Sequence, residues 1–309
     1  MDEGPTSSDD ATTASSGNTP APAVRTPLYR ASNAPRYGRQ SLIKEIQGKE
    51  NRKLICYVAG AAASMTRDDV LPLVDLFHTV PEGSNIDLML QTPGGDVDAA
   101  EKMASMLRKR VGPESEFRVI VPDYAKSAGT LIALASDTIL MSDSSELGPV
   151  DPQLPLPDGS GRANLRPVQS YVDGHDALVE LVNQEPNAAG YRLMLDKYDP
   201  TTIDLCRKVL ERSTRLAEEL LKGGMFRPPR GGNFTGVARD LSDNKKWLWH
   251  GAPIDHKEAE RLGLAVTYLA PRDPNWEQYW NLYCEQRLAL NDSNTAKLFE
   301  SDYVSLVIG

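Results

Sequence analysis

The residues most suited to chemistry lie in two short motifs within the stretch 88–152. One motif contains the pair Gly94 and Gly95, and the other places Ser127 directly before Ala128. Paired glycines let the backbone adopt positive φ angles, so that N–H groups can point at an incoming oxygen. A serine that begins a helix carries an accessible hydroxyl beside unpaired N–H groups, here including that of Ala128. Together the motifs predict a serine nucleophile next to an oxyanion hole.

Both motifs lie where a strand gives way to a helix. The apolar run 86–90 ends at the glycine pair, and a helical pattern begins near Asp96. The run 117–121 ends in a Pro-Asp turn, and a second helical pattern begins at Ser127. Open α/β sheets build their sites at such carboxyl ends of strands. Either motif alone is more often an ordinary turn or helix cap, but two on consecutive strand–helix units favour a site.

The alternation of strand and helix patterns continues over residues 54–141, which predicts an α/β fold with a mainly parallel sheet and helices packed around it. Beyond this region, a Pro- and Gly-rich loop is expected over 154–166. Helical patterns then cover 173–184, 191–197 and 201–222.

Composition divides the chain into three parts. Residues 1–25 are rich in Ser, Thr, Pro and Asp and predict a disordered tail. Residues 26–270 form the expected main domain. Residues 271–309 are expected to be a C-terminal helical extension, whose aromatic helix would dock on the main domain or on a partner.

Charge and cysteine usage exclude several classes of function. The net charge of −9 argues against general affinity for nucleic acid or anionic membranes. The three cysteines match no metal-binding spacing, so we expect no metal and no cofactor. The N-terminal residues show no basic region followed by an apolar one, so we expect no secretory signal, and the longest uncharged apolar run is too short to cross a bilayer. These features predict a cytoplasmic protein.

Three segments of the chain resemble the serine dehydrogenase proteinase family, which is distantly related to the ClpP protease and the signal peptide peptidase SppA within the crotonase-like fold. These segments are Thr92-Pro93-Gly94-Gly95-Asp96, Ala125-Lys126-Ser127-Ala128-Gly129-Thr130 and Gly148-Pro149-Val150-Asp151-Pro152-Gln153. The resemblance extends over about residues 26–270. It implies a serine endopeptidase with Ser127 as the nucleophile, an oxyanion hole from Gly94, Gly95 and Ala128, peptide or protein substrates, and assembly as a homo-oligomer.

The resemblance leaves more than one candidate for the general base. Asp151 occupies the place where ClpP carries its histidine, whereas a Ser, Asp, His order in the nearer family implies Ser127, Asp151 and then His250, with His175 as the second choice. The SppA-like relatives instead imply a lysine, and Lys197 is the best placed by order. Two aspartates flank Lys197 in the sequence and would stabilise its charged form, which ranks it below the histidine.

Two other functions remain open at this stage. An acyl-CoA enzyme of the crotonase type would also use a Gly-Gly oxyanion hole but would give Ser127 no role. A catalytically inactive scaffold would keep the ClpP-like fold and lack the base. A nicotinamide site is not expected, because no Gly-x-Gly-x-x-Gly motif opens a helix.

Overall fold

The computed structural model describes residues 26–157, 162–290 and 293–309. The tail expected over residues 1–25 lies outside the described residues. The chain divides into a short unit that ends at Ala34 and a large unit, Pro35–Gly309. In the short unit, helix α1 (Pro27–Ser32) is followed by Asn33, whose side chain donates to the Tyr29 carbonyl 2.8 Å away.

A seven-stranded sheet forms the centre of the large unit and confirms the predicted α/β class. Its order is β11-β10-β1-β2-β3-β5-β9, and every pair from β1 to β9 is parallel, whereas β10 and β11 are antiparallel. The strands are β1 (Lys53–Ala59), β2 (Ile86–Gln91), β3 (Phe117–Ile120), β5 (Thr138–Met141), β9 (Val266–Tyr268), β10 (Lys297–Glu300) and β11 (Ser305–Ile308).

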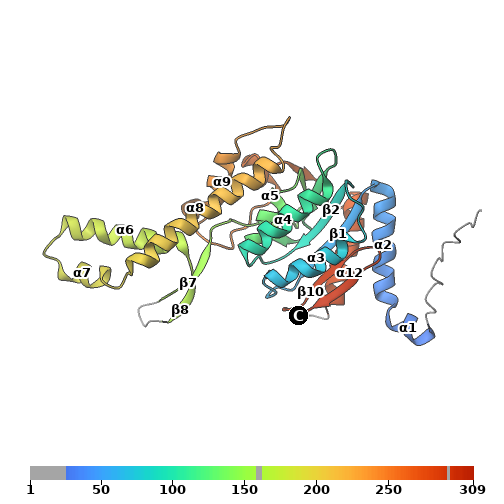
Figure 1. The fold of residues 1–309 in the computed structure, drawn as a ribbon, viewed down its shortest axis with the longest axis horizontal. Coiled ribbons are helices and arrows are strands. Elements are labelled where there is room, and N and C mark those ends of the chain that lie inside the picture. Colours follow the sequence, from blue (N-terminus) through green and yellow to red (C-terminus); the bar gives the residue numbers. More distant parts are fainter. Residues whose placement is uncertain (1–25, 158–161, 291–292) are drawn as a thin grey trace, which may run out of the picture. The chain divides into compact units, whose positions relative to one another are not determined.

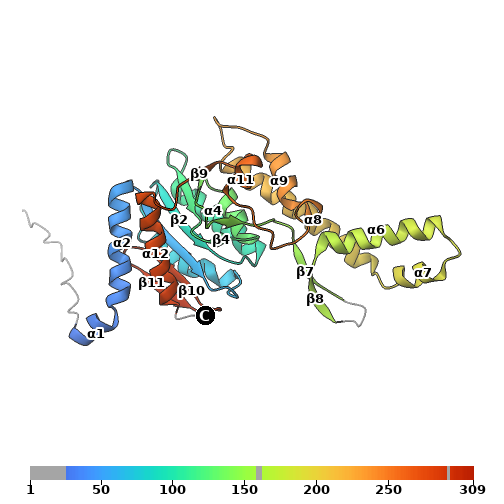
Figure 2. The same cartoon turned by 180° about the vertical axis from the view of Figure 1, so that it is seen from behind.

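Helices cover both faces of this sheet, so its central strands are buried on both sides, as parallel sheets require. On one face α2 (Ala34–Glu50) and α12 (Pro274–Ala289) pack on Leu54, Cys56 and Val58 of β1 (Figure 2). On the other face lie α3 (Val70–Phe77), α4 (Val97–Val111), α5 (Ala128–Leu134) and α8 (Pro200–Gly223) (Figure 1). No helix in the described part of the chain is both long and apolar enough to cross a membrane.

The C-terminal segment differs from the helical extension expected over 271–309. Its helix is α12, whose Trp276, Tyr279 and Tyr283 are buried against the sheet, so the helix docks on the main domain. The chain then returns as β10 and β11, which belong to the central sheet. The sequence pattern of β10 hides this strand, because its two ends are charged residues that are buried in ion pairs, Lys297 with Asp69 and Glu300 with Arg39.

The loop expected over residues 154–166 is instead part of a two-stranded hairpin. Strands β7 (Gln153–Pro157) and β8 (Ala163–Pro167) pair antiparallel, with Pro155 opposite Leu165. These strands pair only with each other among the described residues. Prolines are compatible with β7 and β8, because the outer edge of each strand forms no ladder hydrogen bond and needs no N–H donor.

Beyond the hairpin, the three helices expected from the sequence are present. They are α6 (Val168–Gln184), α7 (Ala189–Leu195) and α8, and α6 packs along α8 on a small core of its own (Figure 1). Helices α9 (Phe234–Ser242), α10 (Asn244–Trp247) and α11 (His256–Arg261) follow and lead to β9.

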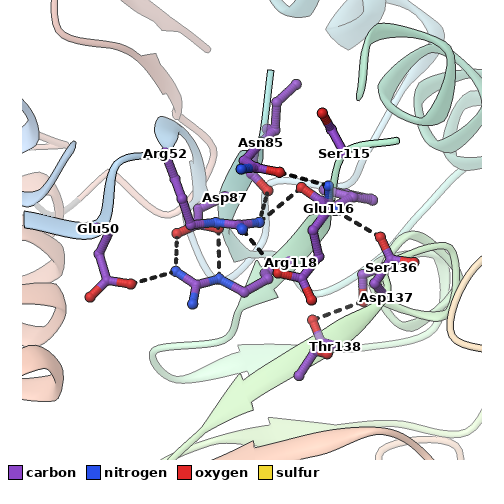
Figure 3. A network of polar contacts seen from close by, with 12 residues as sticks. Glu50, Arg52, Asn85, Asp87, Ser115, Glu116, Arg118, Ser136, Asp137 and Thr138 are labelled. Atoms are coloured by element: carbon purple, nitrogen blue, oxygen red, sulfur yellow. Dashed lines mark hydrogen bonds and ion pairs between the residues drawn. The ribbon is translucent and has the colours of Figure 1, made fainter. Parts of the chain in front are cut away.

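A charged network joins the amino ends of the central strands (Figure 3). Asp87 at the start of β2 is almost fully buried and accepts from Arg52 at 2.5 Å and from Arg118 at 2.6 and 2.9 Å. Arg118 also pairs with Glu50 at 2.9 Å, and Arg52 pairs with Glu116 at 3.0 Å. These bonds connect the end of α2 with β2 and β3.

We expect Asp87→Ala to lower the free energy of unfolding by about 3–5 kcal/mol, because two arginines would remain without their central carboxylate. Chemical denaturation followed by circular dichroism measures the change. Glu45→Ala is the control, since Glu45 forms an exposed helical pair with Lys49 and such pairs contribute less than about 0.5 kcal/mol. Equal losses in the two variants would contradict a stabilising role for the network.

Candidate active site

Ser127 stands at the amino end of α5 in a strained backbone conformation. Its φ is 49° and its ψ is −110°, in a region that residues with a side chain rarely adopt. Strain of this kind persists where the surrounding structure imposes it and is found often at functional sites. The Ser127 hydroxyl makes no capping hydrogen bond to the helix, so it does not act as an ordinary N-cap. The side chain is partly exposed, at the wall of a pocket.

The glycine pair follows β2 and lies against the Ser127 turn. Gly94 has φ +103°, and a Cβ on it would lie 2.8 Å from the Lys126 carbonyl oxygen and 3.0 Å from the Ser127 Cβ. Gly95 has φ +145°, and a Cβ there would lie 2.4 Å from the carbonyl oxygen of Met65. Both positions therefore require glycine for conformation and for space.

The two glycines differ in the state of their N–H groups. The Gly94 N–H donates to the Thr92 hydroxyl at 3.1 Å. Among the described residues, neither the Gly95 N–H nor the Ala128 N–H has an acceptor. Ala128 is the first residue of α5, and N–H groups in the first turn of a helix have no partner within the helix. Gly95 and Ala128 thus offer free donors, whereas Gly94 does not.

Asp151 and His250 are brought together across 99 positions of sequence. The His250 Nδ1 lies 2.7 Å from an Asp151 carboxylate oxygen, and Asp151 is 3% exposed. A carboxylate accepts only, so Nδ1 carries the proton and Nε2 is left as the basic nitrogen.

Backbone contacts hold the two segments in place. Leu147 and Ile254 form an antiparallel bridge through hydrogen bonds of 2.9 and 3.0 Å. The Val150 N–H donates to the Leu241 carbonyl at 3.0 Å, and the Ser213 hydroxyl donates to the Val150 carbonyl at 3.0 Å. Helices α8 and α9 therefore position the segment that carries Asp151.

One pocket of about 470 Å³ contains most of these groups. Ser127, His250, Gly94 and Gly95 all line it, and Asp151 supports His250 from behind. The remaining wall is mainly apolar, with Ala61, Ala62, Pro93, Val97, Leu131, Val150, Pro152 and Leu165, and with Ser64 and Gln153 as further polar residues. No group of three His, Cys, Asp or Glu side chains suited to a metal ion occurs in the described part of the chain.

No hydrogen bond joins the Ser127 hydroxyl to His250 among the described residues, although both line the same pocket. Bonds of this kind often tighten only when substrate is bound. The other proposed bases lie elsewhere. Lys197 is an exposed residue after α7, and His175 on α6 contacts Asp176 at 2.7 Å; neither lines the pocket. Lys126 points away, because its Nζ pairs with Glu146 at 2.7 Å.

A buried polar network supports the loop opposite Ser127. Asp69 accepts from the Tyr57 hydroxyl at 2.9 Å, from the Thr66 N–H at 2.9 Å and from Lys297 at 2.8 Å. Burial, reinforced by the Asp69 charge, raises the pKa of Tyr57 above its usual range, so the phenol stays protonated and remains a donor. The loop 60–66 is thereby fixed from β1 and from the C-terminal strand β10.

Some residues of this pocket carry no recognisable signal in the sequence. Ser64 lies in a run of small residues that fits no motif, and Leu165 lies in a segment expected to be a loop. Only the pairing of β7 with β8 brings Leu165 to the pocket wall. The glycine turn and Ser127, in contrast, were evident from the strand–turn–helix pattern.

Comparison with protein families confirms the resemblance noted in the sequence. Residues 39–162 match the family described as ClpP-like SDH-type serine proteinase. This segment contains the glycine turn, Ser127 and Asp151, and the match supports a peptidase. His250 and the C-terminal strands lie beyond it.

Two relatives and two solved structures are similar to parts of this chain. Uncharacterized protein MJ0137 of Methanocaldococcus jannaschii is 29% identical over 76% of this chain and 75% of its own length. Uncharacterized protein MJ1495 of the same organism is 28% identical over 67% of this chain and 61% of its own length. Among solved structures, the 1510-N membrane-bound stomatin-specific protease is 19% identical, covering 72% of this chain and 82% of that chain, with a TM-score of 0.43. A probable enoyl-CoA hydratase/isomerase from Mycobacterium abscessus is 16% identical, covering 73% of this chain and 66% of that chain, with a TM-score of 0.30.

We expect Gly95→Ala to destabilise the protein by about 1–3 kcal/mol more than Gly83→Ala. Both glycines have positive φ, but a Cβ at Gly83 meets nothing within 4 Å. Gly83→Ala therefore tests backbone strain alone, worth about 1–2 kcal/mol, while Gly95→Ala adds a clash with the Met65 backbone. Urea unfolding of both variants measures the difference. Equal losses of stability in the two variants would contradict a clash between a Cβ at position 95 and the Met65 backbone.

Proposed function

We propose that this chain, as a relative of the ClpP-like SDH-type serine proteinases, is a serine endopeptidase that cleaves peptide or protein substrates through an acyl-enzyme on Ser127. The observation that carries the proposal is the 2.7 Å contact between His250 and buried Asp151, beside the pocket that Ser127 and His250 both line. Chemically, a hydroxyl nucleophile needs a base that a third group orients.

In the proposed reaction, the Ser127 Oγ attacks the carbonyl carbon of the scissile peptide bond while the Nε2 of His250 takes up the hydroxyl proton. Asp151 holds the imidazole through Nδ1 and stabilises the imidazolium that forms. His250 then returns the proton to the leaving amine, which departs as the C–N bond breaks. Water, activated by the same histidine, hydrolyses the Ser127 ester and restores the enzyme.

The carbonyl oxygen becomes an alkoxide during the attack and needs donors fixed in advance. We assign this role to the N–H groups of Gly95 and Ala128, because both are free of protein acceptors among the described residues. Ala128 follows Ser127 in the chain, and Gly95 lines the same pocket as Ser127. Gly94 has a different role in this scheme. Its N–H is already bound to Thr92, so Gly94 serves to bring the turn against Ser127 without a side chain in between.

The geometry disfavours the Ser127/Lys197 dyad, because Lys197 is exposed and does not line the pocket. The geometry of the site does not support an acyl-CoA enzyme either, since that chemistry would give the Asp151–His250 pair no role. An inactive scaffold would not need a strained serine beside an oriented histidine. Reaction with a serine-directed fluorophosphonate separates the peptidase from both of these alternatives.

We also propose that copies of the chain assemble with one another. Leu193 and Met194 on α7 are 66% and 52% exposed, and Leu205 on α8 is 53% exposed. Exposed apolar side chains on helices that are consecutive in the chain are typical of surfaces that bury against a partner.

Four single variants test the catalytic assignment. We expect Ser127→Ala and His250→Ala each to lower peptidase turnover by about 10⁶-fold, because nucleophile and base act as a unit. Asp151→Asn should lower turnover by about 10⁴-fold, since the histidine loses its orienting carboxylate. Lys197→Ala should leave turnover unchanged. The measurement is the cleavage rate of a quenched-fluorescence peptide library.

His175→Ala is the matched control for histidine loss, because His175 also contacts an aspartate at 2.7 Å but does not line the pocket. An inactive Lys197→Ala beside an active His250→Ala would disprove the triad and leave Ser127 as the nucleophile of a dyad.

For assembly, we expect light scattering at micromolar concentration to give a mass of at least two chains. The double variant Leu193→Glu/Met194→Glu should shift that mass towards one chain, because buried carboxylates oppose association. Leu288→Glu, at a more exposed site on α12, is the control. A wild-type monomer would contradict the proposed assembly.

A further inference from the structure

We infer that Ser64 is a further catalytic residue, whose hydroxyl donates a hydrogen bond to the oxyanion formed during attack by Ser127. This inference rests on the proposed function. It adds a side-chain donor to the two backbone donors already assigned. Ser64 belongs to no recognisable sequence motif, and only its position in the fold indicates a role for it.

The first observation is the position of Ser64 in the pocket. It follows β1 in the loop 60–66, and it lines the same pocket as Ser127 and His250. A Cβ built on Gly95 would lie 2.6 Å from the Ser64 Oγ, while a Cβ on the preceding Gly94 would lie 3.0 Å from the Ser127 Cβ. The two serine side chains therefore contact neighbouring residues of one turn. The Ser64 hydroxyl lies beside the glycine whose N–H we assign to the oxyanion hole.

The second observation is that the loop carrying Ser64 is fixed to this turn. The Met65 N–H donates to the Gly94 carbonyl at 2.7 Å, and the Asp96 N–H donates to the Met65 carbonyl at 2.9 Å. One residue further on, the Thr66 N–H is bound by buried Asp69 at 2.9 Å. These bonds fix the backbone that carries Ser64, which limits the reorganisation needed at the moment of reaction, and such preorganisation is the condition for effective oxyanion stabilisation.

The third observation concerns the hydroxyl itself. Across the described residues, the Ser64 Oγ has no hydrogen-bond partner, and the residue is exposed and lines the pocket of Ser127 as well as a neighbouring one. Thr66, two positions later in the same loop, differs because its Oγ1 lies 3.5 Å from Lys297. A hydroxyl can rotate its hydrogen towards a substrate oxygen without moving its own oxygen. Ser64 thus has a proton to offer and no protein acceptor to compete for it.

The hydrogen bond from Ser64 does not change which bonds form and break in the attack by Ser127. The bond from the Ser127 Oγ to the carbonyl carbon forms, the π electron pair moves onto the carbonyl oxygen, and the Ser127 proton passes to His250. Ser64 keeps its proton and contributes only a hydrogen bond, together with the N–H groups of Gly95 and Ala128. The interaction grows as charge develops on the oxygen, so it lowers the barrier more than it strengthens substrate binding.

The test compares Ser64→Ala with Ser64→Thr, which keeps a hydroxyl. We expect Ser64→Ala to lower kcat by about 100-fold with KM nearly unchanged, as for the loss of one oxyanion-hole donor. Ser64→Thr should recover most of that loss. Ser84→Ala is the control, since Ser84 is partly exposed in a loop away from the pocket and its hydroxyl donates to the Pro81 carbonyl. A peptide boronic acid, which forms a tetrahedral adduct on a serine, should bind Ser64→Ala more weakly by a similar factor.

The outcomes separate this inference from the proposed function. If wild type is active, Ser127→Ala is inactive and Ser64→Ala matches wild type, the role of Ser64 is disproved and the peptidase stands. If KM rises while kcat is kept, Ser64 binds substrate and is no oxyanion donor, which also overturns the inference. If wild type neither cleaves peptides nor reacts with a fluorophosphonate, both proposals fail. Circular dichroism and urea unfolding of Ser64→Ala show whether the variant keeps its fold.

Discussion

The close approach of three backbone segments around Gly94 and Gly95 is the constraint on which the site depends. The turn after β2 contacts the Ser127 turn on one side and the Met65 loop on the other, with no space for a Cβ on either glycine. Isolated bridges join Met65 to Gly95 and Thr92 to Ala125. Because the contacts are between backbones, they hold N–H groups in fixed directions, which flexible side chains could not do as well.

The amino ends and the carboxyl ends of the central strands differ in their polar groups. At the amino ends, buried Asp87 and Asp137 are each paired with two arginines, so that neither buried carboxylate lacks a cationic partner. At the carboxyl ends the pocket is mostly apolar, and its N–H donors at Gly95 and Ala128 have no protein acceptor. Unpaired donors in apolar surroundings lower the stability of the fold. The ion pairs at the amino ends of the strands and the large core offset this loss.

Support for the site extends well beyond residues 39–162, the segment that matches the family model. His250 comes from the loop before α11 and meets Asp151. Lys297 comes from β10 and neutralises Asp69, which holds both Tyr57 and the loop that carries Ser64. The C-terminal strands are therefore part of the framework of the site, even though they carry no motif of their own.

The sequence by itself determined the parallel α/β core, the glycine turn and the position of Ser127, because apolar runs, Gly-Gly turns and helix starts are local patterns. It did not determine the β7–β8 hairpin, where prolines and glycines resemble a loop, nor β10, where Lys297 and Glu300 conceal a buried strand. The pairing of His250 with Asp151 was expected from residue order in related proteins, and only the tertiary structure brings the two side chains together. The place of Ser64 had no sequence signal at all. Contacts between distant segments depend on how the helices and strands pack, and no local pattern of residues records that packing.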